Sequence, residues 1–396
     1  MHVNENFAQV GKNYLFSTIA RKVAAYAKAN PDERIIRLGI GDVTEPLVPV
    51  VISAMHKAVD EMADKKTFRG YCDDAEGYLF LREAVAGFYA DHGADLSPDE
   101  VFISDGAKSD LGNFLDLTAP GSTALIPDPV YPAYVDTNLM CGHKIEYIHG
   151  SAIDGFLPGP DDAIDADIVY ICSPNNPTGA VYDAAGLAAW VGYALEHDAL
   201  IIFDSAYETF IRTDGLPHTI YEIDGAEKCA VEISSFSKRA GFTGVRCGFT
   251  VVPTTLTVAD GDLNQMWRRR QNTKFNGVPY IVQRAAEAAL SPLGIQQTQA
   301  QVDYYLGNAR VIGRGLSEMG IEYFGGTNSP YVWMRCPDDM GSWDFFDRLL
   351  EQAQVVGTPG AGFGPAGEGY LRLSAFGQRP DAEEAMERMK AMLAAH

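Results

Sequence analysis

The stretch IVYICSPNNPTGAVYDAAGLAAWVGYALEHDALIIFDSAY, residues 168–207, decides the fold. Two short apolar runs, residues 168–172 and 199–203, flank a segment of helical length. Buried parallel strands have this nearly continuous apolar character, and a helix is the usual connection between two of them. The stretch therefore predicts a strand, a helix and a second strand parallel to the first.

The same alternation of apolar runs and helical segments extends through the middle of the chain. Apolar runs at residues 101–104 and 123–127 are each followed by a polar loop and a segment of helical length. Beyond Pro279 the pattern changes to long helical segments with short apolar runs between them, as at residues 297–320 and 331–337. We therefore expect an α/β chain with a large, mostly parallel sheet covered on both faces, followed by a smaller α+β domain.

The composition is that of a folded globular chain with a strong acidic excess. Of the 396 residues, 46% are hydrophobic and 21% are charged, which is close to the average for soluble domains. The 31 lysines and arginines against 53 aspartates and glutamates leave a formal net charge of −22. Because this charge repels a phosphate backbone and anionic lipid, we expect no nucleic-acid partner and no membrane partner.

The cysteines and histidines have no spacing that is typical of a metal site. The six cysteines lie far apart and form no Cys-x-x-Cys pair, and the eight histidines show no helical two-ligand spacing. We therefore expect no metal and a reducing compartment. The N-terminus lacks a basic start followed by an apolar stretch. Since no apolar run reaches about 18 residues either, we expect a cytoplasmic protein.

Polar and aromatic residues follow each expected strand of the large sheet. Lys108 lies after the first run, Tyr131 after the second, and Asn176 after the third. Asp204 and Tyr207 follow the fourth run. In open α/β sheets, ligands bind beyond the carboxyl ends of the parallel strands. We therefore expect these five side chains at one rim of the sheet, where they can contact the same ligand.

A lysine among hydroxyl groups indicates which ligand this rim binds. Lys238 ends the sequence Ser-Phe-Ser-Lys, residues 235–238, and Arg246 follows it. Such a lysine can bind an aldehyde covalently, while hydroxyls and a guanidinium hold a phosphate. Pyridoxal phosphate also needs an acid near its ring nitrogen, such as Asp204, and donors to its phenolate oxygen, such as Tyr207.

Each of these residues also has a purely structural interpretation. Lys238 can lie in a solvated turn capped by serine, Asp204 can cap a turn, and Arg246 can be a surface charge. Taken singly, most of them favour that interpretation. Their occurrence together and in this order instead predicts one pyridoxal phosphate site, with Tyr131 against the ring and the backbone amides after Gly106 at the phosphate.

Three motifs carry a family resemblance that covers nearly the whole chain. Residues 173–179 read S-P-x-N-P-T-G and residues 204–207 read D-x-A-Y. Residues 235–238 read S-x-S-K, with Arg246 beyond them. In these motifs the sequence resembles the class I and II aminotransferases, which are pyridoxal-phosphate enzymes of fold type I.

The resemblance implies a fold and a division of the chain. It implies an α/β fold, with a mostly parallel seven-stranded sheet in a large cofactor-binding domain and a smaller α+β domain. Carried over to this chain, the large domain comprises residues 46–285 and the small C-terminal domain comprises residues 286–396. The N-terminal segment, residues 1–45, contributes to the small domain and to the active site.

Within this family the chain resembles the LL-diaminopimelate aminotransferases. The stretches that carry this resemblance are residues 13–16, 39–42, 104–108, 132–137, 275–277 and 370–372. It implies reversible transfer of an amino group between LL-2,6-diaminopimelate and 2-oxoglutarate, forming tetrahydrodipicolinate and glutamate, in lysine biosynthesis. Two alternatives stay open. One is another aminotransferase of this class, acting on aspartate, an aromatic amino acid or alanine. The other is a β-lyase on the same fold.

The resemblance also implies roles for individual residues. Lys238 binds the cofactor and moves a proton during the reaction, with Asp204 and Tyr207 as further catalytic residues. The residues implied in cofactor binding are Tyr71, Ala107, Lys108, Tyr131, Asn176, Asp204, Tyr207, Ser235, Ser237, Lys238 and Arg246. Those implied in substrate binding are Tyr14, Gly41, Lys108, Tyr131, Asn176, Asn276 and Arg372. Since Tyr71 and Asn276 come from a second subunit, the resemblance implies a homodimer with shared active sites.

The two ends of the substrate meet different residues in the enzymes that this chain resembles. Arg372 matches the arginine that holds the α-carboxylate, and a guanidinium suits a carboxylate because it donates two parallel hydrogen bonds. A glutamate near the tyrosine at the phosphate helps to bind the distal end. Here the stretch after Tyr71 is Cys-Asp-Asp-Ala-Glu-Gly, one residue longer. Asp73, Asp74 or Glu76 can supply the acid, and the sequence leaves the choice open.

Overall fold

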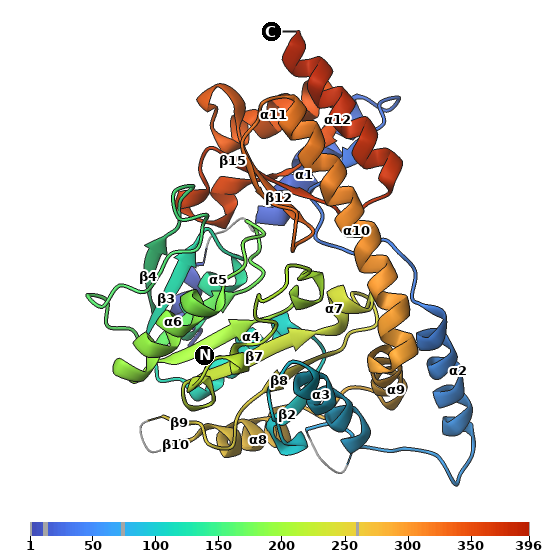
Figure 1. The fold of residues 1–396 in the computed structure, drawn as a ribbon, viewed down its shortest axis with the longest axis vertical. Helices are drawn as coiled ribbons and strands as arrows, with labels where there is room; N and C mark the ends of the chain where they lie inside the picture. The colour runs from blue at the N-terminus through green and yellow to red at the C-terminus, as the bar shows by residue number, and fades with distance from the viewer. Residues whose placement is uncertain (1, 11–14, 73–75, 259–260, 396) are drawn as a thin grey trace.

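The structure, a computed structural model, describes residues 2–10, 15–72, 76–258 and 261–395. Figure 1 shows two regions: a lower one around a large sheet, and an upper one formed mainly by the C-terminal part of the chain. The long helix α10 runs from one region into the other. No helix in the described ranges has the length and apolar character that crossing a bilayer requires.

A seven-stranded sheet forms the centre of the lower region. Its strands are β2 (Val101–Ser104), β3 (Thr123–Asp128), β4 (Lys144–His149), β5 (Ile168–Cys172), β6 (Leu200–Asp204), β7 (Ala230–Ser235) and β8 (Gly248–Val251). They lie in the order β2-β8-β7-β6-β5-β3-β4. Strand β8 is antiparallel to β2 and β7, and the other neighbouring strands are parallel. The prediction of a large, mostly parallel sheet is confirmed.

Helices cover both faces of this sheet because successive strand side chains point to opposite faces. In β5, Ile168 and Tyr170 join the buried cluster on one face, whereas Val169 and Ile171 join that on the other. The helices on the first face are α4 (Ala107–Asn113), α5 (Ala133–Cys141) and α8 (Leu263–Lys274). Those on the second face are α2 (Pro49–Ala63), α3 (Leu79–Asp91), α6 (Ala184–Glu196) and α9 (Tyr280–Leu290).

The upper region contains a smaller, antiparallel sheet. Its strands, in spatial order, are β11 (Tyr323–Gly325), β12 (Tyr331–Arg335), β15 (Tyr370–Ser374) and β14 (Thr358–Pro359). The helices of this region are α1 (Leu15–Ala29), α10 (Pro292–Glu318), α11 (Ser342–Ala353) and α12 (Arg379–Ala394). The short elements elsewhere include α7 (Phe236–Arg239) and the strand pair β9 (Thr257–Val258) and β10 (Gly261–Asp262).

Residues 15–38 pack into the upper region, whereas Asn4 contacts the lower one, where its side chain donates a hydrogen bond of 2.9 Å to the Met140 carbonyl of α5. Strand β1 (Ile36–Arg37) pairs in parallel with β13 (Val355–Val356). Val23 of α1, Ile36 and Leu38 are buried in one apolar cluster with side chains of α10, α11 and α12. The chain therefore returns to its own N-terminal segment after completing the lower region.

Two helices differ in extent from the sequence prediction. The segment of helical length that follows the apolar run at residues 101–104 spans residues 107–119, and it is α4 followed by a separate 3₁₀ helix, Phe114–Leu117. Helix α10 begins earlier than predicted, at Pro292. Proline fits the first helical position, and the Ser291 side chain accepts a backbone hydrogen bond of 3.1 Å there.

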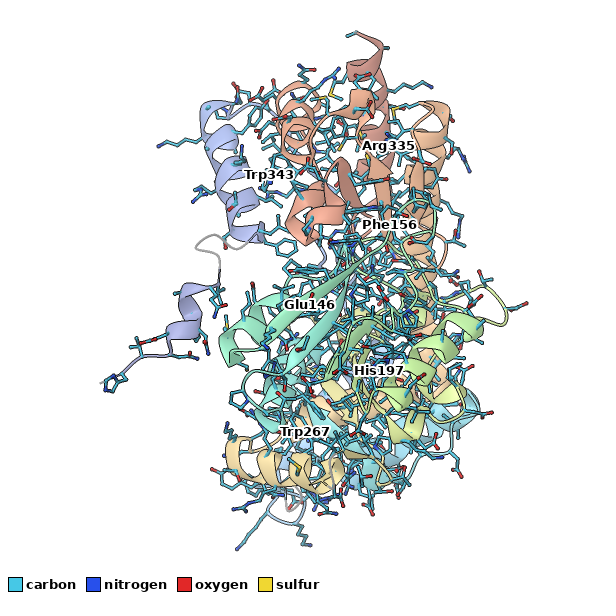
Figure 2. The ribbon with its side chains drawn as sticks, turned by 90° about the vertical axis from the view of Figure 1, so that its left-hand side faces the viewer. Glu146, Phe156, His197, Trp267, Arg335 and Trp343 are labelled. Carbon is cyan, nitrogen blue, oxygen red and sulfur yellow. The ribbon has the colours of Figure 1, made fainter. Side chains whose placement is uncertain are left out.

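The two regions contact each other through aromatic rings and a carboxylate. Phe156, labelled near the boundary in Figure 2, packs edge-on against Trp333 and Tyr370 of the small sheet. Asp128, at the end of β3, accepts a hydrogen bond of 2.8 Å from the backbone of Ala366. Its other carboxylate oxygen lies where a Cβ atom of Gly364 would lie, at 1.7 Å. Only glycine therefore fits at this crossing between the regions.

We expect Gly364→Ala to destabilise the protein more than Gly369→Ala does. Gly364 has φ +126° and a steric conflict with Asp128, whereas Gly369 has φ +79° and no atom within 4 Å of an added Cβ. Backbone strain alone costs about 1–2 kcal/mol, and the clash adds about 1–3 kcal/mol. Denaturant unfolding of both variants measures the difference. Equal free energies of unfolding would contradict the close contact.

Candidate active site

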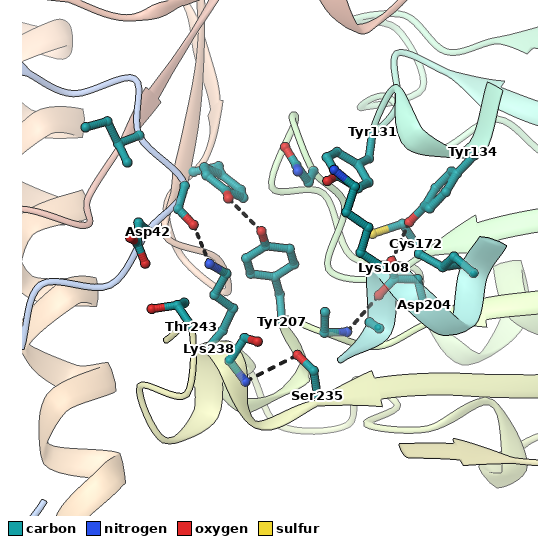
Figure 3. Close-up of a pocket in the computed structure, with 18 of the residues that line it drawn as sticks. Asp42, Lys108, Tyr131, Tyr134, Cys172, Asp204, Tyr207, Ser235, Lys238 and Thr243 are labelled. Carbon is teal, nitrogen blue, oxygen red and sulfur yellow. Dashed lines mark hydrogen bonds between the residues drawn. The ribbon is translucent and has the colours of Figure 1, made fainter. Parts of the chain in front are cut away.

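A pocket of about 370 Å³ lies between the two regions, beyond the carboxyl ends of β5, β6 and β7 (Figure 3). Of the residues singled out in the sequence, those that line it are Gly41, Ala107, Lys108, Tyr131, Asn176, Asp204, Tyr207, Ser235, Ser237, Lys238, Arg246 and Arg372. Residues far apart in the chain thus meet in one cavity, as expected for side chains that follow parallel strands.

Other singled-out residues lie elsewhere. Tyr71 is 84% exposed and lines a separate surface hollow beside Phe68, and Asn276 is also exposed. Tyr14, Asp73 and Asp74 lie outside the described residues. Glu76 is buried and its carboxylate accepts a hydrogen bond from Arg268, so this acid already has a cationic partner.

Lys238 points into the pocket from the short helix that follows β7. Ser235 caps this helix, and its side chain accepts a hydrogen bond of 3.3 Å from the backbone of Ser237. The Lys238 Nζ donates to the carbonyl oxygen of Gly41. Burial lowers the pKa of Lys238 to about 8, with the Asp42 carboxylate opposing the shift and the Arg372 and Arg246 guanidiniums adding to it. About a tenth of the amine is therefore neutral, and nucleophilic, at pH 7.

Asp204 lies on the floor of the pocket at the end of β6. Its carboxylate accepts a hydrogen bond of 2.6 Å from the Tyr134 hydroxyl and one of 3.0 Å from the Ala206 backbone. Burial raises the pKa of Asp204, and these two neutral donors offset only part of the rise. A protonated ring nitrogen in the pocket would keep this carboxylate ionised, so Asp204 fits the ring-nitrogen end of pyridoxal phosphate.

The part of the pocket around Arg246 and Ser237 is suited to binding an anion. Arg246 Nη1 lies 3.4 Å from the Ser237 hydroxyl, to which it donates. Its Nη2 occupies the space beside Gly106, where an added Cβ would approach to 2.3 Å. A guanidinium and serine hydroxyls are thus gathered beside the first residues of α4, Ala107 and Lys108. This donor set fits a phosphate group.

Arg372 is a buried cation that donates hydrogen bonds to neutral oxygens. It is 1% exposed. It donates to Asn176 Oδ1 at 2.6 Å and to the Gly39 carbonyl at 2.9 Å. Its Nε is buried and has no hydrogen-bond partner among the residues that the structure describes. Because burying a charge is costly unless it is paired, this side chain fits an incoming carboxylate.

Two tyrosines of the pocket have contacts that the sequence analysis did not anticipate. Tyr331 of β12 exchanges a hydrogen bond of 2.6 Å with Tyr207, and its ring lies under the Arg372 guanidinium, 4.3 Å away. Tyr134 donates to Asp204. Tyr331 lies in an apolar stretch where a tyrosine is expected to be a core residue, and Tyr134 lies within a helical segment, so only the fold reveals that their hydroxyls face polar partners.

A second group of polar side chains lies behind the pocket. The ligand atoms of His92, Glu208 and His218 lie within 4.8 Å of one another. The spacing of the histidines in the sequence gave no sign of this cluster. The Glu208 carboxylate is already engaged, since one oxygen accepts from Arg239 and the other lies 2.6 Å from His218 Nδ1.

Known proteins of this type share the sequence and the fold. Residues 33–389 match the family described as aminotransferase class I and II. An LL-diaminopimelate aminotransferase of Agathobacter rectalis is 52% identical over 403 residues, covering 98% of this chain and 99% of that protein. One of Bacteroides fragilis is also 52% identical, over 98% of both chains. The solved L,L-diaminopimelate aminotransferase of Chlamydomonas reinhardtii has a TM-score of 0.93 and 41% identity, covering 99% of this chain and 98% of that one.

The lowered pKa of Lys238 predicts how the reactivity of its amine depends on pH in protein from which the cofactor has been removed. Only a neutral amine attacks an aldehyde, so reductive methylation of Lys238 should increase with pH around a midpoint of about 8. Peptide mapping by mass spectrometry at a series of pH values measures this. A free peptide carrying the same sequence is the control, since an unperturbed lysine titrates at about 10.4. Equal midpoints for the protein and the peptide would contradict the buried environment.

Proposed function

The chain belongs to the class I and II aminotransferases, and we propose that it transfers an amino group reversibly between LL-2,6-diaminopimelate and 2-oxoglutarate. The products are glutamate and, once the keto acid has cyclised with loss of water, tetrahydrodipicolinate. The observation that carries the proposal is Arg372, a buried guanidinium beside Lys238 whose Nε has no partner within the described part of the chain. Together with full-length similarity to relatives named for this reaction, it favours an amino acid with a free α-carboxylate.

Pyridoxal 5′-phosphate is the cofactor of this family. When bound, it supplies an aldehyde that takes up the amino group and a ring that withdraws electrons. We assign the ring nitrogen to Asp204, the phenolate oxygen to Asn176 and Tyr207, and one ring face to Tyr131. The residues assigned to the phosphate are Ala107, Lys108, Ser235, Ser237 and Arg246. All of these residues line the pocket.

Lys238 is assigned the proton transfer. With cofactor and substrate bound, this amine would take the proton from the substrate Cα and would deliver it to the cofactor C4′. A group that both accepts and donates a proton works best when its pKa is near the working pH. Burial brings the pKa of Lys238 to about 8, whereas an unperturbed lysine would stay protonated.

The two ends of the substrate are assigned to different parts of the protein. Arg372 holds the α-carboxylate, with Asn176 Oδ1 fixing its guanidinium through the hydrogen bond of 2.6 Å. Gly41, Lys108, Tyr131 and Tyr14 are the further substrate contacts. For the distal amino group we favour Asp73 or Asp74 over Glu76, because Arg268 already binds the Glu76 carboxylate.

A homodimer with shared sites accounts for the two assigned residues that the pocket lacks. Tyr71 is 84% exposed and Phe68 beside it 59% exposed, and Asn276 is exposed as well. Exposed aromatic side chains of this size are typical of interfaces. We assign Tyr71 to the phosphate and Asn276 to the substrate of the partner subunit. All six cysteines are unpaired, which suits a reducing compartment, and we propose that the enzyme acts in the cytoplasm.

The proposed substrate can be tested against its closest competitors. Purified enzyme is assayed with 2-oxoglutarate and LL-diaminopimelate, aspartate, tyrosine or alanine as the amino donor. We expect kcat/KM for diaminopimelate to exceed the others by about 100-fold or more, because a buried site that pairs a substrate group rejects analogues lacking it. Preference for another donor would refute the substrate, and release of pyruvate from cystathionine would identify a β-lyase.

Shared sites predict complementation between two inactive variants. Lys238→Ala lacks the amine, and the double variant Tyr71→Ala with Asn276→Ala lacks the residues assigned to the partner's site. After unfolding and refolding together, half of the dimers are mixed and each mixed dimer has one intact site, so activity should reach about a quarter of wild type. Refolding each variant alone is the control. A mixture no more active than its components would contradict shared sites.

A further inference from the structure

Behind the pocket, two charged residues are adjacent in sequence to the residues assigned to catalysis. Glu208 follows Tyr207, and Arg239 follows Lys238. Tyr207 and Lys238 line the pocket, whereas Glu208 and Arg239 are not among the residues that line it. Each segment thus presents one side chain to the pocket and the next one to the interior behind it.

Glu208 and Arg239 form an ion pair in that interior. Arg239 Nη2 donates to Glu208 Oε2, and the side chains are 9% and 6% exposed, in that order. The Arg239 guanidinium also lies over the ring of Phe88, 4.2 Å from its centroid. Burial would raise the pKa of Glu208, but Arg239 and His218 outweigh it and keep that pKa below its usual value. The pair is therefore ionised at neutral pH.

Further contacts fix the Glu208 side of this pair. The second carboxylate oxygen of Glu208 lies 2.6 Å from His218 Nδ1, and the His218 ring stacks on His92 at 4.4 Å. Although His92, Glu208 and His218 are close enough to hold a metal ion, both oxygens of Glu208 are in use and Arg239 places a positive charge against them. Repulsion from that charge disfavours a cation, so the cluster is better suited to holding the chain in place.

We propose that Glu208 and Arg239 are positioning residues whose ion pair fixes Tyr207 and Lys238 relative to each other. The pair joins the segment after β6 to the segment after β7, one residue away from each catalytic side chain. Helix α7 has only four residues, and its N-terminal end is held by Ser235. The ion pair holds its C-terminal end. The proposal rests on Lys238 binding the cofactor, but not on which amino acid is the substrate.

The position of Lys238 determines two measurable properties. The proton affinity of its Nζ depends on its distance from Arg372, Arg246 and Asp42. The rate of proton transfer depends on its alignment with the substrate, and a misplacement of about 1 Å can cost up to about 100-fold in rate. A shift of α7 should therefore change kcat and the titration of the bound cofactor, with less effect on substrate affinity.

The test is the double variant Glu208→Gln with Arg239→Met. Removing both charges leaves no unpaired buried ion, so this variant should fold where either single change destabilises the protein. We expect kcat to fall by about 10- to 100-fold and KM to change much less. In enzyme without substrate, the pH midpoint of the cofactor's visible absorbance should move by about half a pH unit or more. Arg239→Lys, which keeps the charge, should restore part of the rate.

Glu222→Gln is the matched control. Glu222 also accepts a hydrogen bond from the His218 segment, at the His218 backbone, but its side chain is exposed and it does not contact Arg239. We expect wild-type kcat and absorbance titration for this variant. A folded double variant with wild-type kcat and titration midpoint would overturn the proposal. Because the titration uses no substrate, its result stands even if diaminopimelate proves to be the wrong donor.

Discussion

Buried positive charge is the constraint on which the pocket depends. Arg372 is 1% exposed, and arginine cannot relieve the cost of burial by losing its proton. Its guanidinium donates hydrogen bonds to oxygens of Asn176, Gly39 and Thr358, all of which are neutral. Leaving a charge in this state costs several kcal/mol, so binding an anion relieves a penalty already present in the folded chain. A net charge of −22 repels anions elsewhere, which leaves local cations to determine where they bind.

The parallel sheet is what brings these groups to one place. In the register of β5, β6 and β7, Cys172 lies beside Asp204, and Asp204 beside Ile233. The three strands therefore end at nearly the same level, and the residues just beyond them share one rim. The small sheet supplies Arg372 from above, in β15. The position of each charge thus follows from strand register in two separate sheets, whereas the loops between them are free to vary in length and composition.

The sequence predicted the fold class because four strands, β2, β3, β5 and β6, are short continuous apolar runs, and it grouped the pocket residues because they follow those strands. It did not identify β4, β7 or β8 individually. Strand β4 alternates and is partly exposed, and β7 carries Glu232 in its centre. Tyr331 was missed because a tyrosine in an apolar strand reads as core. The sequence alone could not predict the pairing of Glu208 with Arg239. These residues are 31 positions apart and come together only because β6 and β7 are neighbours in the sheet.

A network of buried polar side chains behind the pocket explains how positively charged groups that repel one another can lie close together in it. Glu232 of β7 is buried and its carboxylate accepts hydrogen bonds from Tyr89, Ser205 and Thr219. Ser205 directly follows Asp204, just as Glu208 follows Tyr207. One side of each segment therefore faces the pocket, through Asp204 and Tyr207, while Ser205 and Glu208 form hydrogen bonds away from it. Because those bonds are made in a buried environment of low dielectric, they are strong enough to hold groups that repel one another in front. The hydrogen bonds of Ser205 and Glu208 thus hold their neighbours Asp204 and Tyr207 in position at the pocket.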